Sequence, residues 1–178
     1  DLDYLVRYTN AHWLVVDNPG GADDGLFARD AEGRPLCWNR AVAGAPAAAD
    51  ATGICPAIVG EYTLPDGRRV HPVFHLVAQR YLDPQYAPEA VAERCGVPAA
   101  TIRRLAQEIA TAAFDEPVVI EQPWTDVHGM RHERMVGRGV AFHAMRGISA
   151  HSNGFHTCRG LHLLQLLLGA VDTPGSFR

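Results

Sequence analysis

The feature that most constrains the fold is a leucine-rich stretch near the end of the chain, GFHTCRGLHLLQLLLG, at residues 154–169. Six of its residues are leucine: Leu161, Leu163, Leu164, Leu166, Leu167 and Leu168. On a helix these side chains cover most of the circumference, and a helix that is apolar nearly all round is buried in a large protein. We therefore predict a buried helix over residues 154–168, with Gly169 as its C-cap. A chain of 178 residues has difficulty covering such a helix on every side.

Both ends of the chain resemble the interior of a longer protein. The sequence begins at Asp1 rather than at a methionine, and its opening, DLDYLVRYTN, carries no secretory signal. We expect a fragment, with any targeting signal upstream. The net charge of −4 argues against a nucleic-acid partner, and no run approaches the ~20 apolar residues that span a bilayer. We therefore expect no nucleic-acid partner and no direct membrane segment.

The cysteines and histidines do not show the spacing of a metal site. The four cysteines are scattered without a C-x-x-C pair, which supports neither a zinc ribbon nor an iron–sulfur cluster. We expect ordinary thiols, mostly buried. On the predicted helix, His156 and His162 lie about 120° apart, at 100° per residue, and so face different sides. We predict no metal ligands in this chain, and a small zinc enzyme using His151, His156 and Cys158 is the alternative.

Hydrophobic periodicity and turn signals predict the secondary structure. Two β-hairpins are expected, at residues 25–38 and 58–74, and the second contains the turn signal PDGR. Helices are expected at residues 74–82, 88–96 and 97–112, and buried strands at residues 117–120 and 139–145. Residues 41–50 are expected to form a surface connection, and the polar insertion at residues 121–138 has no assignment.

This order of elements predicts the α/β class. We expect a Rossmann-like three-layer fragment of a larger multidomain enzyme, with β-hairpin embellishment. Its expected parts are the end of a preceding α/β segment (1–24), a β-hairpin excursion (25–75) and an α/β segment that binds a dinucleotide cofactor (76–178).

The loop before the leucine-rich helix is the candidate site. A strand that ends in a glycine-bearing turn and leads into a helix collects free backbone N–H groups and the positive end of the helix dipole at one point. Ligands bind at the carboxyl ends of strands in open α/β sheets. We predict that an anionic or dinucleotide-like group binds here. The residues that meet at this turn are Arg146, Gly147, His151, Ser152, Asn153 and Gly154. The alternative is purely structural: Ser152 or Asn153 caps the helix, and the glycines allow the turn.

Three stretches of the sequence resemble a known family. These are VPAATIRRLAQEIA, then PVVI, then VAFHAMRGISAHSNGFHTCRGLHLLQLLLGAVDTPGSFR. They resemble the large subunits of molybdopterin oxidoreductases, the dimethyl-sulfoxide-reductase family. That family commonly has a helix of the form G-V-P-x-x-x-I-R-x-L-A, here residues 96–106, and a loop of the type M-G-x-x-Q-H-x-x-G, here residues 146–154. The opening DLDYLVRYTNAHWLVV is similar to the segment after the family's first dinucleotide-binding half.

The resemblance implies a catalytic subunit that transfers an oxygen atom or two electrons. It implies molybdenum or tungsten held by two pterin guanine dinucleotides, a 4Fe–4S cluster upstream of this chain, and as partners the rest of the large subunit with iron–sulfur and membrane subunits. At the loop, Arg146 and Ala150 stand where the family has Met and Gln. Ala150 can contact a cofactor only through its backbone, whereas Arg146 brings a fixed charge suited to a phosphate or an oxyanion substrate.

The resemblance is strongest to the branch that acts on sulfite, thiosulfate, tetrathionate or polysulfide. The fragment lacks the segments that hold the metal, so we predict that it neither binds molybdenum nor turns over by itself. The alternative function is a non-catalytic α/β module that binds a nucleotide or another anion at residues 146–154.

Overall fold

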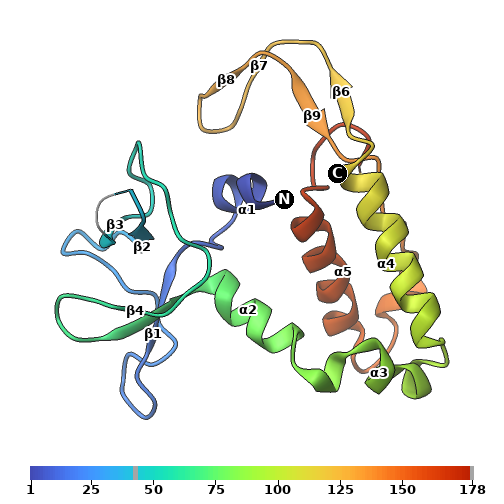
Figure 1. Ribbon diagram of the computed structural model, residues 1–178, viewed down its shortest axis with the longest axis horizontal. Helices are drawn as coiled ribbons and strands as arrows, with labels where there is room; N and C mark the ends of the chain where they lie inside the picture. The colour runs from blue at the N-terminus through green and yellow to red at the C-terminus, as the bar shows by residue number, and fades with distance from the viewer. Residues whose placement is uncertain (42–43, 177–178) are drawn as a thin grey trace. The chain divides into compact units, whose positions relative to one another are not determined.

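The computed structural model describes residues 1–41 and 44–176, which form two compact units. The first unit is Leu5–Ala90, and the second unit combines Asp1–Tyr4 with Val91–Arg178. The helices are α1 (Leu2–Tyr8), α2 (Val73–Tyr81), α3 (Pro88–Cys95), α4 (Ala99–Phe114) and α5 (Gly154–Leu168), with 3-10 turns η1 (Pro84–Tyr86) and η2 (Arg146–Ser149) (Figure 1). None of the described helices is long and apolar enough to cross a membrane.

The strands are short and pair antiparallel. They are β1 (Leu14–Asp17), β2 (Leu36–Asn39), β3 (Ala45–Ala48), β4 (Tyr62–Thr63), β5 (Arg69–Pro72), β6 (Val118–Ile120), β7 (Trp124–Thr125), β8 (Arg131–His132) and β9 (Met135–Gly137). Their sheets are β1-β5-β4, β2-β3, β6-β9 and β7-β8. Helices and small sheets together confirm the predicted α/β class.

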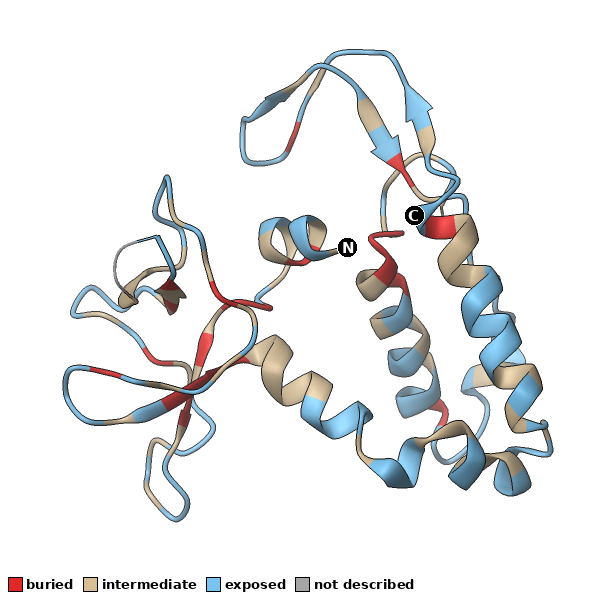
Figure 2. Cartoon of the chain, viewed as in Figure 1, coloured by how far each residue is buried: buried red, intermediate tan, exposed pale blue. Residues whose placement is uncertain are grey.

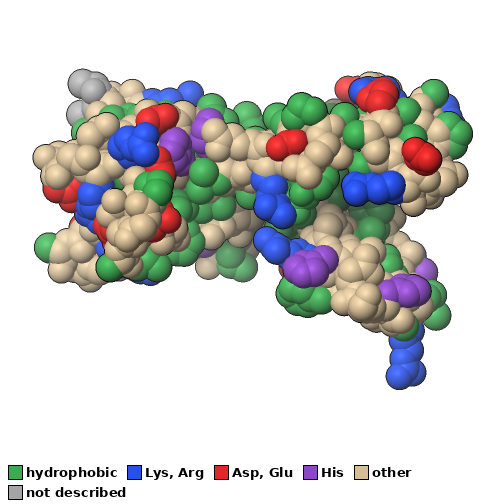
Figure 3. Space-filling view, turned by 90° about the horizontal axis from the view of Figure 1, so that it is seen from below, with side chains coloured by type: hydrophobic (Ala, Val, Ile, Leu, Met, Phe, Trp, Pro, Cys, Tyr) green, Lys and Arg blue, Asp and Glu red, His purple; other side chains and the backbone are tan. Residues whose placement is uncertain are grey.

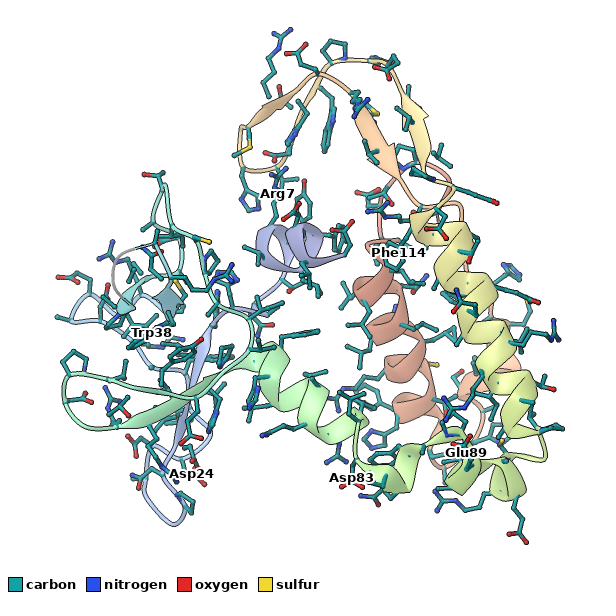
Figure 4. The ribbon with its side chains drawn as sticks, viewed as in Figure 1. Arg7, Asp24, Trp38, Asp83, Glu89 and Phe114 are labelled. Carbon is teal, nitrogen blue, oxygen red and sulfur yellow. The ribbon has the colours of Figure 1, made fainter. Side chains whose placement is uncertain are left out.

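The core of the first unit lies on the three-stranded sheet. Alternate residues of β1 are buried, so Leu14 and Val16 face inward, and β5 pairs beside them in the register Leu14↔Pro72. The buried cluster is Leu14, Val16, Ala28, Leu64 and Val70. Trp38 and Tyr62 pack against it with their rings stacked at 4.5 Å (Figure 4 labels Trp38). This sheet holds β1 and β5 rigidly beside α2, which follows β5 without a loop.

Both predicted hairpins are present in the first unit. In the second hairpin the N–H of Leu64 donates to the carbonyl of Arg68, and Gly67 takes the left-handed conformation (φ 89°) that the turn requires. In the first, Leu36 donates to the carbonyl of Ala28. A surface connection was predicted at residues 41–50. This prediction is wrong for Ala45–Ala48, because these residues form β3 and pair with β2. An Ala-Pro-Ala-Ala run has no strand signal of its own, and its pairing is fixed by the partner strand.

His12 is a buried polar residue of the first unit. It is 5% exposed, and its Nε2 lies 3.3 Å from the carbonyl oxygen of Ala49. Nδ1 is buried without a hydrogen-bond partner. Burial lowers the pKa of His12, because the cation would lose its hydration. Because its partner is a carbonyl oxygen, Nε2 is the donor in this contact.

The core of the second unit lies where α4 and α5 end. The buried residues are Ala113, Val140, Leu168 and Ala170, with Ile109, Ala112 and Phe142 packed against them. Arg138 supports the same region, since it donates to the carbonyl of Ala113 and to the carboxylate of Asp1. Its guanidinium lies 5.3 Å from the ring centre of Phe114 (Figure 4).

Of the two strands predicted in the second unit, one is present and the other is not. The strand at residues 117–120 is present as β6, but its residues are half-buried or exposed, and it pairs with β9. The strand predicted at residues 139–145 is wrong: this segment has no regular structure and is largely exposed. The polar insertion instead forms a ribbon, which we call the arm (residues 118–137), and most of the arm is exposed (Figure 2).

The predicted leucine-rich helix is confirmed as α5, Gly154–Leu168. Gly169 takes φ 70°, and its N–H donates to the carbonyls of Gln165 and Leu166, which ends the helix as predicted. Only Leu168 among the helix's leucines is buried, and Gln165 is buried beside it. The described residues therefore cover one end of α5 and leave most of its apolar surface partly open (Figure 2).

Candidate functional site

The predicted site residues form two consecutive turns ahead of α5. In η2 the side chain of Ser149 donates to the carbonyl of Arg146 at 2.9 Å, and the N–H of Ala150 donates to the carbonyl of Gly147 at 3.2 Å. The N–H of Gly154 then donates to the carbonyl of His151 at 2.9 Å. Residues 146–154 thus form an ordered turn that leads directly into α5.

Gly154 is the residue that allows the two turns to approach. A Cβ added at this position would lie 2.1 Å from the carbonyl oxygen of Ser149, a distance that no side chain tolerates. At Gly147 an added Cβ would meet nothing within 4 Å. Of the two glycines in this turn, only Gly154 is required sterically.

The structural alternative, in which Asn153 caps α5 with its side chain, is wrong for Asn153. Asn153 is the N-cap residue of α5, with φ −103° and ψ 11°, and its side chain makes no capping hydrogen bond. The first turn of α5 contains no acidic residue. Within the described residues, the side chain of Asn153 therefore leaves the acceptor position at this N-cap open.

The side chains around the turn are exposed and polar, and they include a guanidinium and an imidazole. Arg146, His151, Ser152 and Asn153 are all exposed. Within residues 1–41 and 44–176, no carboxylate lies within ion-pair distance of Arg146. A fixed guanidinium charge without a carboxylate beside it is free to pair with an external anion.

The histidines and cysteines of the chain do not gather into a metal site. Among the described residues there is no group of three or more His, Cys, Asp or Glu side chains that could hold a metal ion. The zinc alternative with His151, His156 and Cys158 therefore has no assembled ligand set. The expectation of mostly buried thiols is wrong for Cys55 and Cys95, which are exposed. Cys37 is buried, and burial raises its pKa to about 11.

The tip of the arm contains a buried carboxylate that the sequence patterns did not single out. The side chain of Asp126 is 1% exposed, and its Oδ1 accepts the N–H groups of His128 and Met130, both at 2.9 Å. Its Oδ2 lies 2.9 Å from Nε2 of His132, whose ring stacks on Trp124. The run Asp-Val-His-Gly was a usable signal, because an Asp side chain that bonds the backbone two residues on is a common turn. This cluster organises the arm and does not approach residues 146–154 in any described contact.

A separate cavity of about 340 Å³ lies in the first unit. None of the residues 146–154 lines it. Its lining residues are Val15, Val16, Asp17, Asp24, Gly25, His71, Leu76 and Gln79. The candidate site at residues 146–154 is therefore a surface turn, and the cavity is a distinct feature.

Comparison with known proteins relates the chain to a subunit of a sulfite dehydrogenase. No family model matches the chain. It is 46% identical over 187 residues to a sulfite dehydrogenase subunit of Allochromatium vinosum, in an alignment that covers all of this chain and 19% of that protein. The chain spans about a fifth of the length of the relative that it matches.

This comparison corrects the family assignment made from the motifs. The relative is named as a subunit of sulfite dehydrogenase, and that name specifies neither a molybdopterin large subunit nor the dimethyl-sulfoxide-reductase family. Since no family model matches either, the assignment to that family is not retained. The similarity that stands is to the sulfite dehydrogenase subunit, and it extends along the whole of this chain.

Proposed function

We propose that the chain is part of the catalytic subunit of an oxidoreductase that acts on a sulfur oxyanion, with sulfite as the substrate. The observation that carries the proposal is the 46% identity to the sulfite dehydrogenase subunit along the entire chain. In this reaction sulfite and water give sulfate, two protons and two electrons. Because the relative is one subunit of its enzyme, we propose that the electrons leave through iron–sulfur and membrane subunits.

The turn at residues 146–154 is proposed to bind an anionic group of the cofactor. The supporting observations are the exposed guanidinium of Arg146 without a carboxylate beside it, the N-cap of α5 without a side-chain acceptor, and the close turn at Gly154. Backbone N–H groups at a helix N-terminus and an arginine fork are both suited to phosphate. The remaining predicted contacts are the backbone of Gly147 and Ala150 and the side chains of His151, Ser152 and Asn153.

The proposed cofactor is a pair of pterin guanine dinucleotides that carry molybdenum or tungsten. The residues present fit such a group at its phosphates, because the turn offers positive charge and N–H donors and contains no carboxylate. When bound, the cofactor supplies the two-electron exchange with the sulfur oxyanion. The role of this chain is to hold and orient an anionic part of it. The metal ligands and the iron–sulfur cluster come from outside residues 1–178.

The proposal is tested on the product of the complete reading frame that encodes this chain. We expect the wild type to reduce ferricyanide in the presence of sulfite. Replacing Arg146 by Ala removes a charge-assisted contact and should lower kcat/KM for sulfite by about tenfold or more. The matched control is Arg104→Ala, which removes another exposed arginine, one that pairs with Glu108 on α4. Absence of sulfite-dependent turnover in the wild type would overturn the proposal.

The same experiment separates two contacts of Arg146. If Arg146 holds a phosphate of the cofactor, the variant loses bound guanine nucleotide. If Arg146 contacts the substrate, the nucleotide content is unchanged and KM rises. Binding of a guanine nucleotide by an inactive complete product would instead favour the non-catalytic anion-binding module.

A further inference from the structure

The cavity in the first unit combines an apolar wall with polar groups from four segments. Val15, Val16 and Asp17 come from β1, and His71 comes from the neighbouring strand β5. The loop after β1 contributes Asp24 and Gly25, and α2 contributes Leu76 and Gln79. The volume of about 340 Å³ lies at the lower end of the range for small-molecule sites.

The charge of Asp17 is already compensated. Its Oδ2 lies 2.7 Å from Nη2 of Arg69 and 3.6 Å from Nε2 of His71. His71 is 9% exposed and is held in place by the ring of His75, which stacks on it at 5.3 Å. This side of the cavity is therefore a fixed wall and offers little free charge.

Asp24 is exposed at the mouth of the cavity and carries the charge that is available to a ligand. Its Oδ1 accepts the backbone N–H of Asn18 at 2.9 Å. In the described part of the chain no Arg or His side chain lies within ion-pair distance of Asp24. The neighbouring Asp23 differs, because it accepts from the Asn18 side chain at 2.6 Å and lies 3.7 Å from Arg68. Figure 3 shows acidic, basic and histidine side chains gathered on one face of this unit, and Figure 4 labels Asp24 at its loop.

We propose that this cavity binds a small organic cation, a molecule with an ammonium or guanidinium group and a short aliphatic body. The cationic group pairs with the carboxylate of Asp24. The aliphatic body contacts Val15 and Leu76, and the amide of Gln79 lies at the open side. A carboxylate without a cation attracts a positive ligand, and burying the aliphatic body adds about 25 cal/mol for each Å² removed from water. The inference goes beyond sulfite oxidation, because the carboxylate of Asp24 disfavours an oxyanion at this cavity.

The test is an NMR titration of the full 178-residue chain with n-butylammonium. We expect saturable shifts of the Gly25 and Gln79 amide signals. Butyrate should produce none, and n-butanol should bind about tenfold more weakly or less, because it has the same body without the charge. Equal affinity for butanol and butylammonium, or no saturable shift with butylammonium, would overturn the proposal.

Two pairs of variants locate the site. Asp24→Asn should weaken butylammonium binding about tenfold, whereas Asp23→Asn, the same change one residue earlier outside the cavity lining, should leave it within about twofold. Equal weakening by both variants would mean a general charge effect and contradict the proposal.

Gln79 is exposed on α2, so its replacements should fold even if Asp24→Asn does not. Gln79→Glu should strengthen binding and Gln79→Arg should weaken it, and unchanged affinity in both would contradict the site.

Discussion

At the scale of single residues, Asp126 shows how one carboxylate can organise a turn. Its two oxygens accept from the backbone N–H groups of His128 and Met130 and from Nε2 of His132. All of these bonds are stronger to the ionised carboxylate than to the protonated one. The bond from His132, followed by those of the two backbone N–H groups, lowers the pKa of Asp126 from 3.8 to about 2.

This shift predicts how the tip of the arm responds to acid. Because the folded-state pKa is depressed, the stabilisation is present above about pH 3.8 and is lost as the pH falls through about 2. In an NMR pH titration, the Met130 amide signal should move with a midpoint near pH 2. Asp126→Asn should abolish this step, and Glu133→Gln, at an exposed position of the same arm, should leave it unchanged. A midpoint at or above 3.8 would show that these hydrogen bonds do not form in solution.

At the scale of elements, α5 offers two glycines with opposite constraints. A Cβ at Gly154 would lie 2.1 Å from the carbonyl oxygen of Ser149, and a Cβ at Gly160 would meet nothing within 4 Å. Gly160 lies in the helix interior, where alanine is favoured over glycine by about 1 kcal/mol. At Gly154 the preceding turn must move before any side chain fits.

Alanine at these two glycines should change the free energy of unfolding in opposite directions. Gly160→Ala should raise the free energy of unfolding by about 0.5–1 kcal/mol. Gly154→Ala should lower it by about 1–3 kcal/mol, because the turn at residues 146–154 has to open. Urea unfolding followed by circular dichroism measures both changes. If Gly154→Ala were as stable as Gly160→Ala, the close approach of the two turns would be wrong.

The elements also show what the sequence could predict. The ends of α5 follow from local signals, since the apolar period begins after Gly154 and Gly169 supplies the left-handed cap. The hairpin at residues 64–68 follows from Pro-Asp-Gly. The segment at residues 139–145 has the apolar composition of a strand, but composition does not supply a partner to hydrogen-bond with, and the partner of β6 is β9.

The turn at residues 146–154 is predicted from its glycines and its place between a strand and a helix. The structure has the turn and the helix but not the strand, and it adds that only Gly154 is sterically required. The cavity in the first unit was not predicted, because His71 is far in the sequence from Asp17 and Asp24 and meets them only through the pairing of β1 with β5. Long-range pairing of this kind leaves no local pattern.

At the scale of the whole molecule, the described surface is larger than the mass requires. The chain exposes 11604 Å². Two separate compact proteins, each of half its 19.3 kDa, would together expose about 10,000 Å². Part of this surface is apolar: Leu82, Val127, Met145 and Phe155 are between 73% and 86% exposed.

This surface leads to a prediction for the chain produced by itself. The turn at residues 146–154 supplies one wall of the proposed cofactor site, and the described residues contain no group that could hold a metal. One exposed turn binds an anion weakly, since most of a tightly held ligand is buried by walls on several sides. We therefore expect the purified 178-residue chain to contain no stoichiometric molybdenum or tungsten by elemental analysis and to oxidise no sulfite. Under the same conditions, the complete product of the reading frame should contain molybdenum or tungsten and should oxidise sulfite. Stoichiometric molybdenum in the isolated chain would mean that residues 1–178 hold the metal themselves and would contradict the division of roles proposed above.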